Sequence, residues 1–345
     1  MTQHPDLHLN EDQRMLRDAA QRFLAERHPL SLARAACRRD AAARLALWRE
    51  VADQGWPALL APAALGGLDL GMREAWIVAE AAGRHLLSLP LAANMAILPT
   101  LCEAGAAGPV AQWAAAMMAG ETWYADAAMR PDGSAFIEGA GEGVRALAVS
   151  RVGATALRLD LLAPLAGVAG LDPTMPVALA ARPEVAASVD LDVAPGAWDR
   201  LRTRLRLLRS AELLGAASAA LDMAAAYARE RRQFDRAIGA NQAIKHRLAE
   251  DWMALDDARL AGWAAAAALD ADTPSAQRDC LFAPLLAVEG GRRAAQNAIQ
   301  AHGALGVTWE CDAHLYLKRV LRLSQSLEAE VSCPDLLERI WEGAA

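Results

Sequence analysis

Three long stretches in the C-terminal part of the chain constrain its fold most. Residues 200–231, 241–270 and 278–302 are rich in alanine and leucine, which are strong helix formers. Each stretch predicts a helix of roughly 20–30 residues, well above the average helix length in globular proteins. Long helices at the end of a chain indicate a four-helix bundle, which often also forms an oligomer interface.

The N-terminal part also has a helical pattern. Apolar residues recur at helical spacing over about residues 8–30, where Asn10 is the expected N-cap. Further helices are expected over about residues 41–51, ended by Gly55, and over about residues 72–84. Helix is predicted to continue to about residue 118.

The pattern changes near residue 121. Short β-type runs, such as residues 146–152 and 156–162, are separated by turns rich in proline and glycine. The sequence therefore predicts a mainly α fold with a small β domain. Its parts are an N-terminal helical domain at 1–120, a short middle β domain at 121–197 and a C-terminal helical bundle at 198–345.

Composition excludes several classes of protein. The formal net charge is −7 and the isoelectric point is about 5.6, which argues against a general nucleic-acid binder. The five cysteines are widely spaced without a C-x-x-C pair, so neither a metal site nor a disulfide framework is predicted. The N-terminus lacks a signal-peptide pattern, and no apolar run is long enough to span a bilayer. We therefore expect a cytoplasmic protein without a membrane span.

Three parts of the chain resemble the acyl-CoA dehydrogenase family. Residues 47–56 and 65–71 are similar to its N-terminal helices and GG-x-x-x-G loop. Residues 227–239, followed by 241–249, resemble its R-x-Q-F-G-x-x-I and Q…K-H-x-L-A segments. Residues 300–310 resemble its Q-x-x-G-G-x-G-x-T-x-E segment. The resemblance implies that the chain is a divergent bacterial member, built as a helical, then β, then helical protein.

The second segment contains residue types that suit a dinucleotide. Arg231 offers a fork of donors for a diphosphate, Phe234 an apolar ring for a flat heterocycle, and Gln242 a hydrogen-bonding amide. The resemblance implies that these three residues contact the diphosphate and adenine end of FAD. Taken singly, Arg231 could instead be a solvated helix end and Phe234 a core residue.

The third segment implies an oligomer. By the resemblance, Gln300, Gly303 and Gly306 reach the FAD of a neighbouring subunit, in a homo- or hetero-oligomer. Gly303 could also be a helix C-cap. One departure from the family lies in the second segment, where Asp235 replaces a glycine. A carboxylate beside a diphosphate would repel it, unless Asp235 points away.

The implied reaction is α,β-dehydrogenation of an acyl-CoA or acyl-carrier thioester. A carboxylate must remove the α-proton, and burial in an apolar pocket would raise its pKa toward the working range. Counting from Glu310 places the family's usual base near Leu327, which makes Glu328 a candidate. A second family variant places the base at Leu205. Glu212 lies two turns further along the same helix face, and it is either a second candidate or an interhelical hydrogen-bond partner.

Three functions follow from these patterns. The chain is an FAD-dependent acyl-CoA dehydrogenase, a catalytically incomplete partner subunit of a heteromeric acyl-CoA dehydrogenase, or a non-enzymatic binding module on the same fold. The T-E-P-x-A-G-S-D segment of the family's middle domain has no counterpart over residues 122–133, which favours the partner subunit.

Overall fold

The structure is a computed structural model that describes residues 8–38, 41–104, 108–130, 132–141, 144–168, 170–330 and 338. The chain forms two compact units. Unit 1 consists of residues 1–30, 76–86 and 209–345, and unit 2 consists of residues 31–75 and 87–208. Helices α4 (Met72–Arg84) and α7 (Ala197–Glu230) each contribute residues to both units.

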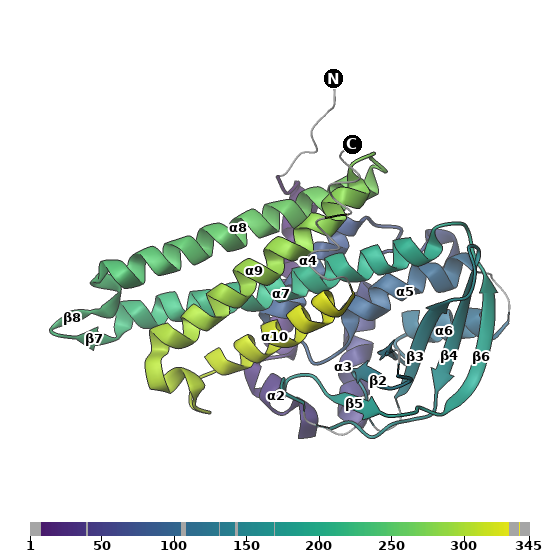
Figure 1. Ribbon diagram of the computed structural model, residues 1–345, viewed down its shortest axis with the longest axis horizontal. Coiled ribbons are helices and arrows are strands. Elements are labelled where there is room, and N and C mark those ends of the chain that lie inside the picture. Colours follow the sequence, from purple (N-terminus) through teal and green to yellow (C-terminus); the bar gives the residue numbers. More distant parts are fainter. Residues whose placement is uncertain are drawn as a thin grey trace. The chain divides into compact units, whose positions relative to one another are not determined.

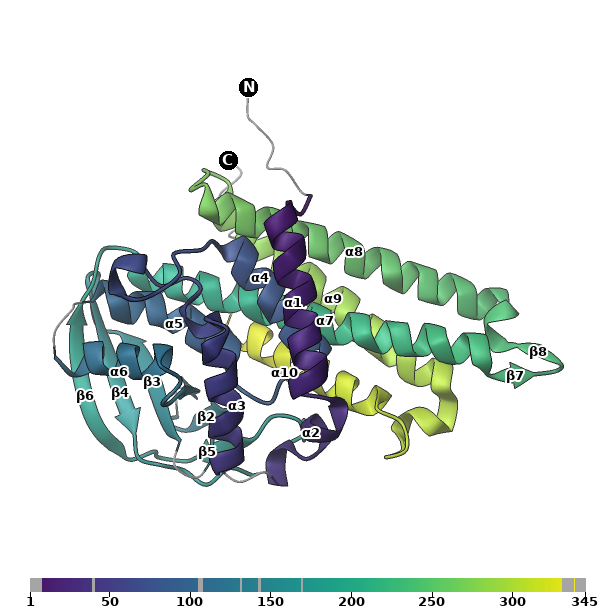
Figure 2. The same cartoon turned by 180° about the vertical axis from the view of Figure 1, so that it is seen from behind.

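Unit 1 is built from long helices. Besides parts of α4 and α7, it contains α1 (Glu11–Arg27), β7 (Arg232–Gln233), β8 (Arg236–Ala237), η4 (Ile238–Ala240), α8 (Gln242–Asp270), α9 (Ala276–His302), η5 (Gly303–Val307) and α10 (Ala313–Glu330). Figure 1 shows α8 and α9 side by side, and α10 packs on α9. Figure 2 shows α1 from the opposite side.

Local signals place the N-terminal helices. The side chain of Asn10 accepts a hydrogen bond from the Gln13 backbone at 2.8 Å, and the Gln13 side chain accepts one from the Asn10 backbone at 3.0 Å. This capping box satisfies backbone donors that the first turn of α1 leaves without a helical partner. The predicted N-cap is therefore confirmed.

Glycine allows two helices of unit 1 to cross at very short distance. A Cβ atom on Gly83 of α4 would lie 1.8 Å from the carbonyl oxygen of Glu212 in α7. A Cβ atom on Gly215 of α7 would lie 1.9 Å from the carbonyl oxygen of Glu80 in α4. Any larger residue would force the two backbones apart, because packed interiors hold no spare volume.

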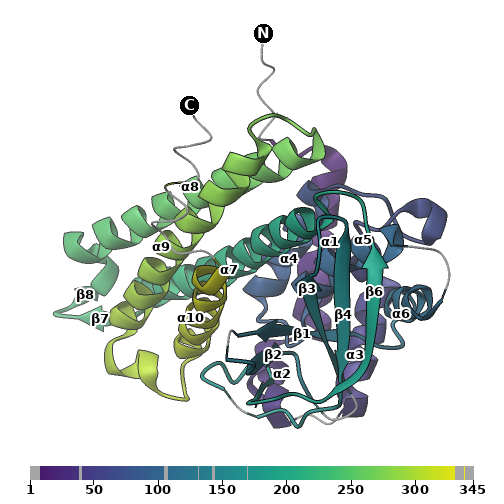
Figure 3. The same ribbon diagram turned by 45° about the vertical axis from the view of Figure 1, so that its right-hand side comes forward.

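Unit 2 places helices beside one sheet. The helical elements are α2 (Leu30–Arg34), η1 (Ala36–Arg38), α3 (Ala41–Asp53), η2 (Trp56–Ala58), η3 (Ala63–Leu65), α5 (Leu91–Glu103) and α6 (Pro109–Met118). The strands are β1 (Tyr124–Met129), β2 (Ala135–Glu138), β3 (Arg145–Arg151), β4 (Ala156–Leu162), β5 (Val177–Ala180) and β6 (Val185–Asp192). The strand order is β5-β2-β1-β3-β4-β6, and Figure 3 shows this sheet.

The sheet has two distinct faces. Strands β1 and β3 are parallel, and the other neighbours are antiparallel. Alternate leucines of β4, such as Leu159, are buried, whereas Arg158 and Asp160 point to the opposite face. There Arg158 pairs with Asp190 of β6 at 2.7 Å. Asp160 accepts a hydrogen bond from the hydroxyl of Ser188, which also belongs to β6. Period-two alternation of this kind marks a half-buried strand.

The predicted mainly α fold with a small β domain is confirmed. The helix over residues 72–84 has the predicted bounds, and α9 includes Pro284 within its length. The short β7–β8 hairpin was not predicted. The three-domain division at residues 120 and 197 stays a prediction. Within the described part of the chain, no helix has the length and apolar character needed to cross a membrane.

Candidate functional site

The β7–β8 hairpin carries Phe234 at its tip. Phe234 and Asp235 form the two-residue turn, with φ angles of 52° and 62°. Positive φ at both central residues is the type I′ geometry that suits the twist of a hairpin. The Phe234 side chain is 93% exposed, so the interpretation as a core residue is wrong.

Asp235 adopts a left-handed backbone conformation at the position where the resembled motif has glycine. Aspartate tolerates the left-handed conformation better than most residues. The Asp235 carbonyl accepts a hydrogen bond from Arg232 at 2.7 Å, which fixes the backbone of the turn. Aspartate at this position is therefore compatible with the tight turn of the hairpin.

Arg231 and Gln242 flank the hairpin. The backbone of Arg231 donates to the Tyr227 carbonyl and accepts from the Ile238 amide, both at 2.8 Å, while its side chain is exposed. Gln242 is the first residue of α8 and is also exposed. Arg231, Phe234 and Gln242 thus lie on or beside the β7–β8 hairpin. Figure 1 shows this hairpin between the end of α7 and the start of α8.

A stacked pair joins this hairpin end to the third motif segment. The ring of His302, at the end of α9, stacks on Tyr227 of α7 with centroids 4.5 Å apart. The Nδ1 atom of His302 lies 2.8 Å from the Ala298 carbonyl. Residues that are more than 70 positions apart in the sequence are therefore neighbours, and sequence spacing gave no signal of this stack.

Residues 300–310, the third segment of the resemblance, include the end of α9 and the short helix η5, which contacts α9. Gly303 has φ 62° and ψ −140°, and its amide donates to the Gln300 carbonyl, so the interpretation of Gly303 as a C-cap is confirmed. A Cβ atom there would meet nothing within 4 Å. Gly306 is buried, and a Cβ atom on it would lie 2.9 Å from the Ile299 carbonyl oxygen. The cofactor roles of Gln300, Gly303 and Gly306 stay predictions.

Glu212, one candidate base, lies in the interior of unit 1. Its carboxylate bonds Nη1 of Arg319 at 2.8 Å and lies 3.5 Å from Nη2 of Arg322. Arg319 is fully buried and also donates to the Leu86 carbonyl at 3.3 Å. Two guanidinium groups thus compensate the charge of this carboxylate and connect α7 to α10, so Glu212 makes the expected type of interhelical bond.

Glu328, the other candidate base, lies on the surface of α10. Its side chain is 50% exposed, and its Oε1 accepts a hydrogen bond from Nη1 of Arg292 in α9 at 2.7 Å. Nη2 of Arg292 bonds the second carboxylate oxygen. This two-bond geometry is typical of arginine–carboxylate pairs. The base role stays a prediction for Glu212 and for Glu328.

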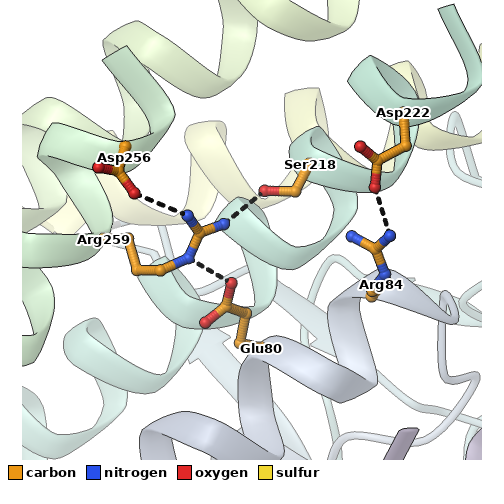
Figure 4. A network of polar contacts seen from close by, with 6 residues as sticks. All are labelled: Glu80, Arg84, Ser218, Asp222, Asp256 and Arg259. Carbon is orange, nitrogen blue, oxygen red and sulfur yellow. Dashed lines mark hydrogen bonds and ion pairs between the residues drawn. The ribbon is translucent and has the colours of Figure 1, made fainter. Parts of the chain in front are cut away.

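A larger polar network connects α4, α7 and α8 in unit 1 (Figure 4). Arg259 donates to Glu80 at 2.7 Å and to Ser218 at 2.9 Å, and Asp256 lies at 3.5 Å. Burial alone would lower the pKa of Arg259. The negative charges of Glu80, Asp256 and Asp222 have the larger combined effect, so the pKa of Arg259 is raised. Arg84 pairs with Asp222 in the same network. These groups hold helices together, and no local sequence pattern predicted them.

Unit 2 contains a hollow between α5, α7 and strands β1 and β3. It is partly open, and the space of about 450 Å³ that its walls outline includes open solvent. Leu205, the position that the resemblance assigns to the base of a second family variant, lines this hollow together with Ile97 and other apolar side chains. Tyr124, Asp126 and Arg202 are its polar members.

Two of these polar residues have defined surroundings. Burial raises the pKa of Tyr124 to about 12, with Arg145 opposing the shift, so the phenol keeps its proton at neutral pH. The guanidinium carbon of Arg202 lies 5.6 Å from the ring centroid of Trp198, within the range of a cation–π contact. Among the described residues, no group of three or more His, Cys, Asp or Glu side chains could hold a metal ion.

Comparison with known proteins identifies the family. The model of the acyl-CoA dehydrogenase N-terminal domain matches residues 10–121, and that of the C-terminal domain matches residues 201–328. The chain is 33% identical over 336 residues to the acyl-CoA dehydrogenase IpdE2 of Mycobacterium tuberculosis, covering 96% of this chain and 98% of the relative. The chain therefore belongs to the acyl-CoA dehydrogenase family, whose members are flavoprotein oxidoreductases.

Solved structures share the fold. The ChsE4–ChsE5 complex from Mycobacterium tuberculosis matches with a TM-score of 0.75 and 24% identity, over 98% of each chain. The FAD complex of PigA matches with a TM-score of 0.78 and 18% identity, over 97% of this chain and 98% of that chain. One structural relative is thus a complex of two different proteins, and another binds FAD.

Proposed function

We propose that this chain binds FAD and dehydrogenates the α,β bond of an acyl-CoA or acyl-carrier thioester. The observation that carries the proposal is the grouping of Arg231, Phe234 and Gln242 around one exposed hairpin. A phenylalanine ring that is 93% exposed contributes nothing to the core. Its position is accounted for if the ring packs against a ligand or a partner.

The residues of this hairpin end suit the cofactor. The exposed guanidinium of Arg231 can take a diphosphate oxygen, and Gln242 in the first turn of α8 lies at the positive end of a helix dipole. The open space around Gly303 lets a ligand approach the backbone there. When bound, FAD accepts the hydride from the β-carbon of the substrate.

The hollow in unit 2 is the proposed acyl site. Ile97, Leu147 and Leu205 give it apolar walls of the kind that suit an acyl chain. The position of Leu205 supports this assignment, because a family variant carries its base there. A leucine cannot remove a proton, so the base of this chain must come from another residue, and Glu328 and Glu212 remain the candidates.

The first experiment is a visible absorption spectrum of the purified protein, before and after anaerobic addition of a panel of acyl-CoAs. We expect a yellow protein that bleaches with at least one ester. Glu328→Gln and Glu212→Gln then separate the two candidates, since loss of the base stops bleaching but leaves bound flavin visible. A protein that stays colourless after incubation with FAD would exclude the stand-alone enzyme.

A partner subunit is the second candidate function. The observation in its favour is that both candidate carboxylates are paired with arginine, Glu212 with Arg319 and Glu328 with Arg292. A carboxylate whose oxygens are hydrogen-bonded to a guanidinium is less available to take a proton from a substrate. Such a chain would contribute Arg231 and Gln300 to FAD held jointly with a different subunit.

Co-purification distinguishes these two functions. A tagged chain that gains flavin and activity only together with a second dehydrogenase-like protein would establish the partner subunit. A homo-oligomer that bleaches alone would exclude it. A cytoplasmic location stays a prediction from the sequence.

A further inference from the structure

Helix α8 has an exposed ridge whose residues complement their own reverse order. Lys245, Ala249, Met253 and Asp257 are all exposed and follow one another at intervals of four residues, which places them in one row along the helix. In order they are a cation, a small residue, a large apolar residue and an anion. We infer that two copies of this chain pair through α8, with the two helices antiparallel. This contact contains no residue of 300–310 and does not depend on FAD.

The antiparallel direction follows from the order of the ridge. Two copies related by a two-fold axis present the same surface to each other, so their contacts are reciprocal. With the axis at the level of Asp251, Lys245 faces Asp257 of the second copy and Ala249 faces Met253 of the second copy. One register thus satisfies both the charges and the side-chain sizes. Parallel helices in register would instead place like charges together, which disfavours association.

Large apolar side chains extend this face of α8. Trp252 is 60% exposed, Met253 57% and Leu260 41%. Covering such side chains releases the water around them, which stabilises association. In Figures 1 and 2, α7 and α9 lie below the half of α8 next to the hairpin, and no described helix or strand of unit 1 is drawn above it. A partner is therefore needed to cover this face.

The charges of the ridge favour a second copy as that partner. Among the described residues, Lys245 and Asp257 take part in no ion pair within the chain. His246 is exposed as well, and in the same register it faces Asp256 of the second copy. A uniformly acidic or basic partner would satisfy only one end of the ridge, whereas a second copy satisfies both ends.

Hydrogen bonds on the opposite side of α8 hold the ridge in place. Asp251 is fully buried and accepts two bonds from Nδ2 of Asn297, at 2.8 and 3.0 Å. It also accepts one from Nε of Arg293 at 3.1 Å, and both donors belong to α9. These bonds fix the rotation of α8 about its axis. A surface that is already ordered loses little conformational freedom when it binds.

The test exchanges the two charges of the ridge. Lys245→Asp places an aspartate against Asp257 of the second copy, and Asp257→Lys places a lysine against Lys245 of the second copy. Each variant alone should raise the dissociation constant of the pair about tenfold or more, because like charges meet at both ends. The double variant Lys245→Asp/Asp257→Lys should return to within about threefold of the original chain. Sedimentation velocity of the full chain over a dilution series measures these constants.

A mixture of the two single variants separates pairing from damage to the fold. One variant carries two anions on the ridge and the other two cations, so each should bind the other in preference to itself. A fluorescent label on one variant identifies the mixed particles. Arg247→Asp and Glu289→Lys are the controls and should leave association unchanged. Arg247 lies about 200° further round α8 than Lys245, and Glu289 is exposed on α9.

The outcomes separate this inference from the proposed function. The inference is wrong if the original chain stays a monomer, if the single variants associate as tightly as the original chain, or if the mixture forms no mixed particles. Association of the original chain only with a different protein would overturn it as well. A colourless protein whose pairing responds to the charge exchange would exclude the stand-alone enzyme and keep the inference. A protein that bleaches with an acyl-CoA, in a particle that Lys245→Asp leaves intact, would do the reverse.

Discussion

The interior of unit 1 and its hairpin end use charged and aromatic side chains in opposite ways. In the interior, Glu212 and Arg319 neutralise each other at 2.8 Å between α7 and α10. At the hairpin end, Phe234 and Arg231 are exposed on a backbone that hydrogen bonds hold in place. The interior charges are therefore committed to helix packing, whereas the hairpin side chains are available to a ligand. Variants of each region should have separable effects on stability and on binding.

The largest effect is expected from Arg319→Met. This change leaves the Glu212 carboxylate buried without its 2.8 Å partner. Breaking a buried pair from one side costs about 3–5 kcal/mol of the free energy of unfolding, which urea denaturation measures. The double variant Glu212→Leu/Arg319→Leu should regain part of the loss, because it removes the unpaired carboxylate but also takes Glu212 away from Arg322. A loss below about 1 kcal/mol for Arg319→Met would show that the interior charges are not coupled in this way.

Phe234→Ala should affect FAD binding much more than it affects the stability of the fold. The ring is 93% exposed, so the free energy of unfolding should change by less than about 0.5 kcal/mol. Loss of an aromatic contact with the adenine should weaken FAD binding about tenfold, which flavin fluorescence titration measures. Met129→Ala, which truncates an exposed apolar side chain in the other unit, is the control. Unchanged FAD affinity would remove the hairpin from the cofactor site.

Asp235→Gly tests the departure from the family pattern and should have a smaller effect. Glycine adopts the φ of 62° at this position without strain, so the turn should persist. Removing a negative charge near a diphosphate should strengthen FAD binding by about two- to fivefold, and the gain should shrink in high salt. Equal affinities at low salt would indicate that the carboxylate points away from the cofactor.

Tyr124→Phe extends the comparison to unit 2 and should have no effect on pH dependence near neutrality. The folded pKa of about 12 lies above the ordinary value of about 10. The stabilisation from the neutral phenol is therefore complete below pH 10 and is lost as the pH rises toward 12. Denaturation at a series of alkaline pH values should give a shallower loss of stability for Tyr124→Phe than for the original chain. Identical slopes would contradict the raised pKa.

Local signals made the helices predictable. The cap at Asn10 and the bounds of Met72–Arg84 depend on residues within a few positions of each other. The resemblance also placed Leu205, which the structure shows in the wall of a hollow. Such positions follow from short-range spacing along one helix.

The pairing of buried charges could not be predicted in this way. Glu212 was located on an apolar helix face, but its partner Arg319 is 107 positions away, and spacing within one helix cannot reveal it. The β7–β8 hairpin was also missed, because its strands have two residues each and no apolar alternation. Its turn did carry a signal, since aspartate is one of the residues that tolerates positive φ.

The exposed hairpin also makes unit 1 a substrate for trypsin. Arg231, Arg232 and Arg236 are all exposed within six residues, yet the hairpin must open before a protease can hold its backbone in an extended form. The rate of cleavage between α7 and α8 therefore reports how often this small element unpairs. A ligand or a neighbouring chain that covers Phe234 would slow that cleavage, so limited digestion offers a readout of occupancy that needs neither colour nor turnover.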